Sequence, residues 1–317
     1  MAGQPESAFW KDRPVVVTGG AGFVGSVVMR LLNELGASAR VIRSGEHDLR
    51  DAAAARQAVE GAEIVIHLAA RVGGIGFNRR NPAPLVHDNL LIGANVIEQS
   101  RLAGVRKLVA ACTVCAYPKF TPSPFSESEL WNGYPEETNA PYGLAKKMLL
   151  VLSDAYRRQH GFDSCVPVLV NLYGPGDNFD LEDSHVIPAM IRKFVEARER
   201  GDSEVGLWGT GNASREFLYV ADAARALLLA AERLDSSEPV NIGTGKETTI
   251  RELAETIKRL TGFAGEIAWD PSKPDGQPTR RLDVSRAREL LGFEAEVELE
   301  EGLRRTVESF EREPANV

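Results

Sequence analysis

The stretch that most constrains the fold is PVVVTGGAGFVG, residues 14–25. Its VVVT portion is β-branched and uninterrupted, which is typical of a buried parallel strand. Gly19, Gly22 and Gly25 follow at G-x-x-G-x-x-G spacing, and an apolar-periodic run over residues 27–35 predicts a helix. Glycines in this position let the backbone approach a pyrophosphate, and the helix N-terminus offers free N–H groups to its charge. We therefore predict a dinucleotide site, with a purely structural tight turn as the alternative.

Composition limits the other functions open to the chain. It has 317 residues, 43% hydrophobic and 26% charged, enough for one large or two modest globular domains. The net charge of −8 provides no basic surface for nucleic acid, so an anionic ligand requires a local basic pocket. No apolar run is long enough for a membrane span, and the polar residues 1–13 do not resemble a secretory signal. Three cysteines argue against a disulfide framework, so we expect a cytoplasmic protein.

Strands and helices alternate through the first half of the chain. Strands are predicted over residues 39–43, 63–68, 107–111 and 164–170, and long helices over residues 81–103 and 142–160. The alternation predicts an α/β fold with a Rossmann-type, doubly wound parallel sheet. Because ligands of such sheets bind beyond the carboxyl ends of the strands, we expect Thr113, Cys115 and Tyr117 at the site.

The pattern loosens in the second half. We expect residues 1–172 to form the cofactor domain, with returning segments near 214–243, and residues 173–317 to form mainly a smaller α/β substrate-binding domain. Short strands are predicted over 204–208, 215–220 and 238–242, and helices to about residue 200 and over 222–234, 249–261, 285–291 and 299–311. Thr248 or Thr249 is predicted to cap the third of these helices, and Gly262 to end it.

The end of the second predicted strand bears on the choice of cofactor. An acidic residue there would bond a ribose 2′-hydroxyl and favour NAD, but the sequence places Arg40 and Arg43 there, with no acid before Glu46. A cation suits a 2′-phosphate, so we predict NADP with Arg43 as a contact. NAD remains possible, because both arginines can instead be solvated surface charges.

Tyr142 and Lys146 are the clearest catalytic pair in the sequence. Residues four apart on a helix share a face, so the phenol and the ammonium can lie side by side. A nearby cation lowers the pKa of a phenol, which would let Tyr142 pass a proton to a ketone oxygen while Thr113 hydrogen-bonds the same oxygen. Taken alone, the spacing also occurs on helices that merely pack at a surface.

Several longer motifs extend this hypothesis, and they resemble the GDP-L-fucose synthases of the extended short-chain dehydrogenase/reductase group. The resemblance covers nearly the whole chain. Its most specific pieces are AARVGGI (69–75), CAYPK (115–119), NAPYGLAK (139–146), NLYGP-x-DNF (171–179), SHVIPA (184–189), WGTG (208–211), REFL (215–218) and SKPDGQP (272–278). It implies an NADPH-dependent epimerase-reductase in which a GDP-4-keto-6-deoxy-hexose is epimerised at C3 and C5 and then reduced at C4.

The resemblance also implies roles for particular residues. Cys115 and His185 would be the acid/base pair of the epimerisation, and Thr113, Tyr142 and Lys146 would run the reduction. The implied cofactor contacts are Gly19, Gly22, Phe23, Val24, Gly25, Arg43, Asp48, Leu49, Leu68, Ala69, Ala70, Tyr142, Lys146 and His185. The implied substrate contacts are Asn171, Lys193, Trp208, Arg215 and Lys273. A homodimer through the helices near 84–103 and 143–160 is implied as well, although apolar positions there can equally pack within one subunit.

The sequence departs from the family at the end of the 107–111 strand. Cys112-Thr113-Val114-Cys115 stands where fucose synthases carry Gly-Ser-Ser-Cys, and the glycine loop lacks their basic residue. The identity of the hexose therefore stays open, and the two cysteines also permit a redox or zinc interpretation. A second hypothesis is an epimerase, or a 4-ketoreductase only, acting on another keto-sugar nucleotide. A third is a cofactor-sensing protein without catalysis.

Overall fold

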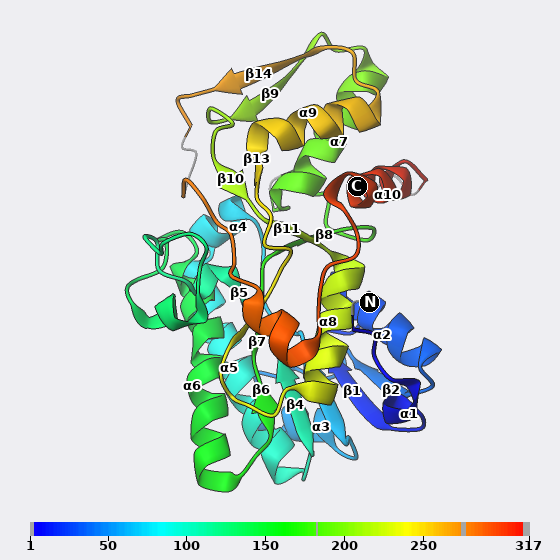
Figure 1. Cartoon of the computed structure of the whole chain (residues 1–317), viewed down its shortest axis with the longest axis vertical. Helices are drawn as coiled ribbons and strands as arrows, with labels where there is room; N and C mark the ends of the chain where they lie inside the picture. Colours follow the sequence, from blue (N-terminus) through cyan, green and yellow to red (C-terminus); the bar gives the residue numbers. More distant parts are fainter. Residues whose placement is uncertain (1–2, 182, 274–276, 313–317) are drawn as a thin grey trace.

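The computed structural model describes residues 3–181, 183–273 and 277–312. Figure 1 shows a larger body built around a central sheet and a smaller body beside its upper end. Residues 274–276 of the SKPDGQP motif lie outside the described residues.

The central sheet is parallel. Its strand order is β2 (Ser38–Ile42), β1 (Pro14–Thr18), β3 (Ile64–His67), β4 (Lys107–Ala110) and β6 (Ser164–Cys165). Past one-residue breaks, β4 and β6 lead into β5 (Cys112–Thr113) and β7 (Pro167–Leu169), and β7 pairs with both β5 and β12 (Val240–Ile242). The predicted doubly wound parallel sheet is confirmed, and β1 occupies the position where the strand order reverses.

Helices cover both faces of this sheet (Figure 1). The chain moves from β1 to β2 through α2 (Phe23–Glu34), then in the opposite direction through α3 (Ala52–Val59), α5 (Pro82–Leu102) and α6 (Ala140–His160). Right-handed crossovers therefore place α2 on one face and the other three on the opposite face. The inner strands β3 and β4 are buried along their whole length, and β1 is buried after Pro14, whereas the edge strand β2 is partly exposed. No helix in the described parts of the chain combines the length and apolar character needed to cross a membrane.

The smaller body has its own apolar cluster, which includes Ile191, Phe194, Leu253 and Leu303. Its helices are α7 (Val186–Arg200), α9 (Ile250–Thr261) and α10 (Leu299–Arg312), and its strand pairs are β9 (Glu204–Trp208) with β14 (Glu266–Asp270) and β10 (Ser214–Arg215) with β13 (Thr248–Thr249). The parallel pair β8 (Asn171–Tyr173) and β11 (Phe217–Tyr219) lies between the bodies (Figure 1). From β11 the chain returns to the larger body through α8 (Val220–Arg233), which packs on α2. The domain boundary near residue 172 stays a prediction.

Local signals predicted some elements well and others poorly. The predicted cap of α9 is confirmed, because Thr249 and Glu252 form a reciprocal capping box and Gly262 ends the helix in the left-handed conformation. The short elements α1 (Ser7–Trp10), α3, α4 (Ile75–Arg80) and β14 were not predicted. The helix predicted over 285–291 is a π-helical turn, Ala287–Leu291.

Candidate active site

A cavity of about 1700 Å³ opens at the carboxyl ends of the parallel strands, and residues of both bodies line it. Every residue expected to be catalytic, cofactor-binding or substrate-binding lies on its wall, whereas Tyr117, which was also expected at the site, does not. Residues as far apart in sequence as Gly19 and Lys273 therefore share one cavity, while their individual roles stay predictions.

The glycine loop after β1 forms one end of the cavity. Gly22 is the N-cap of α2, and Gly25 lies in its first turn. A Cβ atom on Gly25 would stand 2.1 Å from the Gly19 carbonyl oxygen, so only glycine allows the helix to begin this close to the loop. This cradle fits the pyrophosphate of a dinucleotide, whose charge the α2 N-terminus favours.

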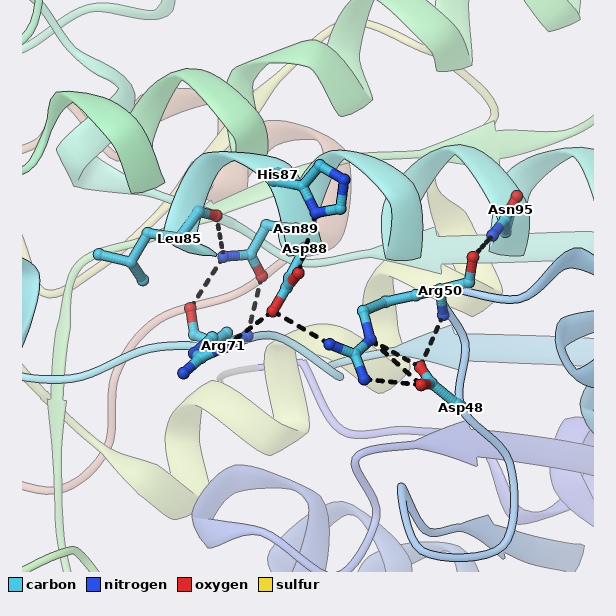
Figure 2. A network of polar contacts seen from close by, with 8 residues as sticks. All are labelled: Asp48, Arg50, Arg71, Leu85, His87, Asp88, Asn89 and Asn95. Atoms are coloured by element: carbon cyan, nitrogen blue, oxygen red, sulfur yellow. Dashed lines mark hydrogen bonds and ion pairs between the residues drawn. The ribbon is translucent and has the colours of Figure 1, made fainter. Parts of the chain in front are cut away.

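An ion-pair network borders the same end of the cavity (Figure 2). The Arg50 guanidinium lies between two carboxylates, 2.7 Å from Asp48 and 3.4 Å from Asp88, and Arg71 lies 2.9 Å from Asp88. The hydrogen bond from Arg50 lowers the pKa of Asp48 to about 2. Asn89 exchanges two hydrogen bonds with the Arg71 backbone, which fixes the loop after β3 to α5. Of this network, only Asp48 was expected at the site. Arg71 belongs to the AARVGGI motif, which was already noted in the sequence. No motif in the sequence marked Arg50, Asp88 or Asn89 as site residues.

The two arginines at the end of β2 lie in different environments. Arg43 lines the cavity, whereas Arg40 does not. Arg40 donates instead to the Glu60 carbonyl at 2.7 Å. Successive strand residues point to opposite faces, so two arginines three apart point in opposite directions. Of the two arginines, only Arg43, the predicted contact, is therefore placed to meet a cofactor in the cavity.

Gly143 brings α6 against the end of β5. A Cβ atom there would stand 2.2 Å from the Cys115 carbonyl oxygen, so α6 and the turn Val114–Ala116 are in direct contact. This contact brings Tyr142 and Lys146 beside Thr113 and Cys115. The Thr113 Oγ1 accepts a hydrogen bond from the Cys115 N–H at 3.2 Å, which leaves its own proton to donate into the cavity.

Burial controls the protonation of the Tyr142–Lys146 pair. It raises the pKa of the Tyr142 phenol, with smaller contributions in the same direction from Cys115 and Cys112. It lowers the pKa of the Lys146 ammonium to about 8. The expectation that Lys146 brings the pKa of Tyr142 down is wrong for the protein alone, because desolvation has the largest effect on this pKa and raises it. A phenol with a raised pKa stays protonated and is a proton donor.

The other two candidate catalytic residues are Cys115, in the larger body, and His185, at the start of α7. Cys115 is half-buried, and the Arg280 Nη1 lies 3.9 Å from its Sγ. Gln277 Oε1 holds the Arg280 guanidinium through two further hydrogen bonds. His185 is the N-cap of α7 and is accessible from the cavity, although desolvation by the cavity walls lowers its pKa. Gln277 and Arg280 were not expected at the site.

The far end of the cavity lies in the smaller body. The indole of Trp208 is 67% exposed, which leaves its face available for stacking, and the Lys273 Nζ stands 5.8 Å from the ring centroid. Arg215 donates to the carbonyl of Gln277, and Asn171 donates to the carbonyl of Glu216. Lys193 donates to the Gly206 carbonyl, and burial lowers its pKa. One cationic group, the Lys273 ammonium, therefore lies beside an exposed aromatic ring, and Arg215 and Lys193 line the same cavity.

Two sequence-based interpretations at the end of β5 change. Tyr117 is not at the cavity: the turn Val114–Ala116 interrupts the strand alternation, and the Tyr117 hydroxyl bonds Asn241 Oδ1 at 2.7 Å in the core.

Cys112 is buried, and its pKa is raised to about 11, which suits a packed thiol. All three cysteines are free, and the described residues contain no group of three metal-ligating side chains. The redox and zinc interpretations gain no support.

The fold and cavity define a nucleotide-binding enzyme of the short-chain type, and the chain belongs to the NAD dependent epimerase/dehydratase family, whose profile matches residues 15–243. It is 43% identical over 305 residues to probable GDP-L-fucose synthase 1 of Oryza sativa subsp. japonica, covering 94% of this chain and 93% of that protein. It is 40% identical to GDP-L-fucose synthase of Escherichia coli (strain K12), covering 93% and 96%. The structure of a GDP-L-fucose synthetase from Naegleria fowleri bound to NADP superposes with a TM-score of 0.87 at 30% identity, covering 99% and 98%.

Proposed function

We propose that this protein is an NADPH-dependent epimerase-reductase that converts GDP-4-keto-6-deoxy-mannose to GDP-L-fucose. The observation that carries the proposal is the meeting, in one cavity, of a proton-donating group for reduction with a thiol and an imidazole for epimerisation. Three relatives named for GDP-L-fucose synthesis, matched over most of their length, support the same activity.

The residues present fit NADP. The Gly25 cradle and the α2 N-terminus receive the pyrophosphate, and Arg43 provides a cation for a 2′-phosphate. No hydrogen bond or ion pair joins the Lys146 ammonium to another residue that the structure describes, so it can bond the nicotinamide ribose. When bound, the reduced cofactor supplies a hydride to C4 of the sugar.

Epimerisation uses Cys115 and His185. The 4-keto group acidifies the protons on C3 and C5, so a base on one face removes a proton and the electron pair moves onto O4. An acid on the other face then returns a proton to the same carbon, which inverts it. A thiol and an imidazole are suitable partners because their ordinary pKa values flank neutrality.

Reduction uses Thr113, Tyr142 and Lys146. As C4 is reduced, O4 becomes an alkoxide and takes the proton of the Tyr142 phenol, whose raised pKa has kept it protonated. The Thr113 hydroxyl donates to the same oxygen, because its acceptor side is already used by the Cys115 N–H. The charged form of Lys146 stabilises the phenolate that remains.

The far end of the cavity suits the nucleotide. Guanine stacks on the exposed face of Trp208, and Lys273 beside it provides charge for the diphosphate. This arrangement favours residues 173–317 as mainly the domain that binds the sugar nucleotide, and residues 1–172 as the domain that binds the cofactor.

We also infer a homodimer. Leu90 and Leu91 on α5, and Met148 and Val151 on α6, are each more than a third exposed, and the two helices pack side by side. A second copy would cover these side chains in a four-helix interface. Light scattering should give twice the chain mass for the wild type and the single mass for Leu90→Glu combined with Val151→Glu; a monomeric wild type would contradict the inference.

The test of the proposed function separates its two halves. NADPH oxidation is followed with GDP-4-keto-6-deoxy-mannose, and the exchange of sugar protons with solvent is followed by mass spectrometry. Cys115→Ser and His185→Gln should slow exchange, whereas Tyr142→Phe should slow NADPH oxidation and leave exchange intact. Exchange without oxidation by the wild type would favour an epimerase that does not reduce. Neither signal from folded protein that binds NADPH would refute the GDP-sugar assignment.

A further inference from the structure

A chain of hydrogen bonds runs along the cavity wall from Glu136 to Asn78. The Glu136 Oε2 accepts from the Asn139 Nδ2 at 2.8 Å, and the Asn139 Oδ1 accepts from the Asn78 Nδ2 at 3.2 Å. All three residues line the cavity. An ionised carboxylate can only accept, so Glu136 sets the orientation of the Asn139 amide, and Asn139 in turn sets that of Asn78.

This chain ends in a buried acceptor. Asn78 is only 4% exposed, yet its Oδ1 has no hydrogen-bond partner in the part of the chain that the structure describes. Buried amide oxygens are nearly always paired, and an unpaired one is costly. Because the amide cannot turn over without breaking its bond to Asn139, the Asn78 oxygen is left for a donor that enters from the cavity, which Asn78 lines.

A second unpaired group lies on the adjacent segment. The Gly74 N–H at the start of α4 donates to the Asp183 carbonyl at 2.7 Å, which joins the helix that carries Asn78 to the loop that carries Ser184. Ser184 also lines the cavity, and its buried Oγ has no partner among the described residues. Ser184 directly precedes His185, and Asn139 lies one helical turn before Tyr142.

We propose that Asn78 accepts a hydrogen bond from a ring hydroxyl of the hexose and that Ser184 bonds the same ring, so that this subsite discriminates among sugars. The inference rests on the proposed function, which requires the sugar ring to lie among Cys115, Tyr142 and His185. A neutral hydroxyl donor fits two neutral groups, one of which can only accept. A sugar that lacks this hydroxyl leaves the Asn78 oxygen unpaired and is rejected more strongly than the loss of one contact suggests.

Binding measurements separate the sugar contact from the nucleotide contact. Affinities for GDP, GDP-L-fucose and its 2-deoxy and 3-deoxy analogues are measured by calorimetry with NADP present. We expect Asn78→Ala to weaken GDP-L-fucose binding about tenfold and to leave GDP binding unchanged. One of the deoxy analogues should bind the wild type poorly, and that penalty should disappear in Asn78→Ala.

Two further variants complete the test. Asn139→Ala should give a smaller loss in the same direction, because it frees the Asn78 amide to turn; it also serves if Asn78→Ala does not fold. Asn132→Ala is the matched control, because Asn132 bonds Glu129 outside the cavity, and it should change nothing.

The possible failures point to different errors. If the wild type turns over the GDP-keto sugar but Asn78→Ala and Asn139→Ala keep the full deoxy penalty, the subsite is refuted while the proposed function stands. A wild type that binds neither GDP nor GDP-L-fucose refutes the proposed function and, with it, the subsite.

Discussion

Replacing Lys146 with methionine should have two effects: it should raise the free energy of unfolding, and it should lower the activity. Lys146 is 4% exposed, and its ammonium has no ion-pair partner among the described residues. Burial lowers its pKa from 10.5 to about 8. One pKa unit corresponds to 1.36 kcal/mol, so carrying this charge at pH 7 costs the folded protein about 3 kcal/mol. Methionine has a similar length and carries no charge, so Lys146→Met should recover most of that free energy.

The pH dependence identifies the cause of the gain. The cost is fully present below the folded pKa of about 8 and is relieved as the pH rises toward 10.5, because the unfolded chain still binds the proton in that range. Urea unfolding of the wild type and of Lys146→Met should therefore differ by about 3 kcal/mol at pH 7 and by only about 1 kcal/mol at pH 9.5. NADPH oxidation by the variant should fall sharply at both pH values.

Lys107 is the matched control. It is also 4% exposed, but its Nζ lies 2.9 Å from the Asp163 carboxylate and donates to the Leu234 carbonyl. Lys107→Met removes the ammonium and leaves these two acceptors without their donor, so it should destabilise the protein by about 1–3 kcal/mol. The assignment of Lys146 as an unpaired buried charge is incorrect if the Lys146→Met variant is less stable than the wild type. It is also incorrect if the gain in the free energy of unfolding does not depend on pH.

Three further outcomes are expected. Arg43→Ala should weaken NADPH binding about 10- to 100-fold with little effect on NADH, measured by nicotinamide fluorescence, whereas Arg40→Ala should change neither; equal losses from both variants would contradict the assignment. The kcat/KM for reduction should decline as the pH rises above about 8, because Lys146 loses its proton there; a flat alkaline profile would remove its charge from the mechanism. Tyr117→Phe should lower the free energy of unfolding by about 1–2 kcal/mol and keep full activity, since the hydroxyl bonds buried Asn241; a selective loss of activity would return Tyr117 to the site.

The features that were predicted correctly from the sequence are those that depend on residues close together in the chain. The glycine loop between a buried strand and a helix located one end of the cavity, the end proposed for the cofactor, because that motif is contiguous. The four-residue spacing of Tyr142 and Lys146 placed both on one face of α6, and the reciprocal cap at Thr249 marked the start of α9. Each of these features depends on residues within one or two turns of each other.

Other features depend on geometry that spacing alone does not contain. Thr113, Cys115 and Tyr117 would share a face if the strand continued, but the turn Val114–Ala116 sends Tyr117 into the core. Asn78 and Arg280 reach the cavity only through the packing of distant segments. In contrast, the separation of Arg40 and Arg43 was contained in the sequence, because strand residues an odd number apart point to opposite faces.

We propose that one cavity performs both epimerisation and reduction. The most direct test is the stoichiometry of a single turnover in deuterium oxide, with GDP-4-keto-6-deoxy-mannose and a limiting amount of NADPH. We expect two non-exchangeable deuterium atoms in the reduced sugar, at C3 and C5, for each NADPH oxidised. A reduced product without deuterium at these carbons would show that the chain is a 4-ketoreductase, and that Cys115 and His185 do not form an acid/base pair.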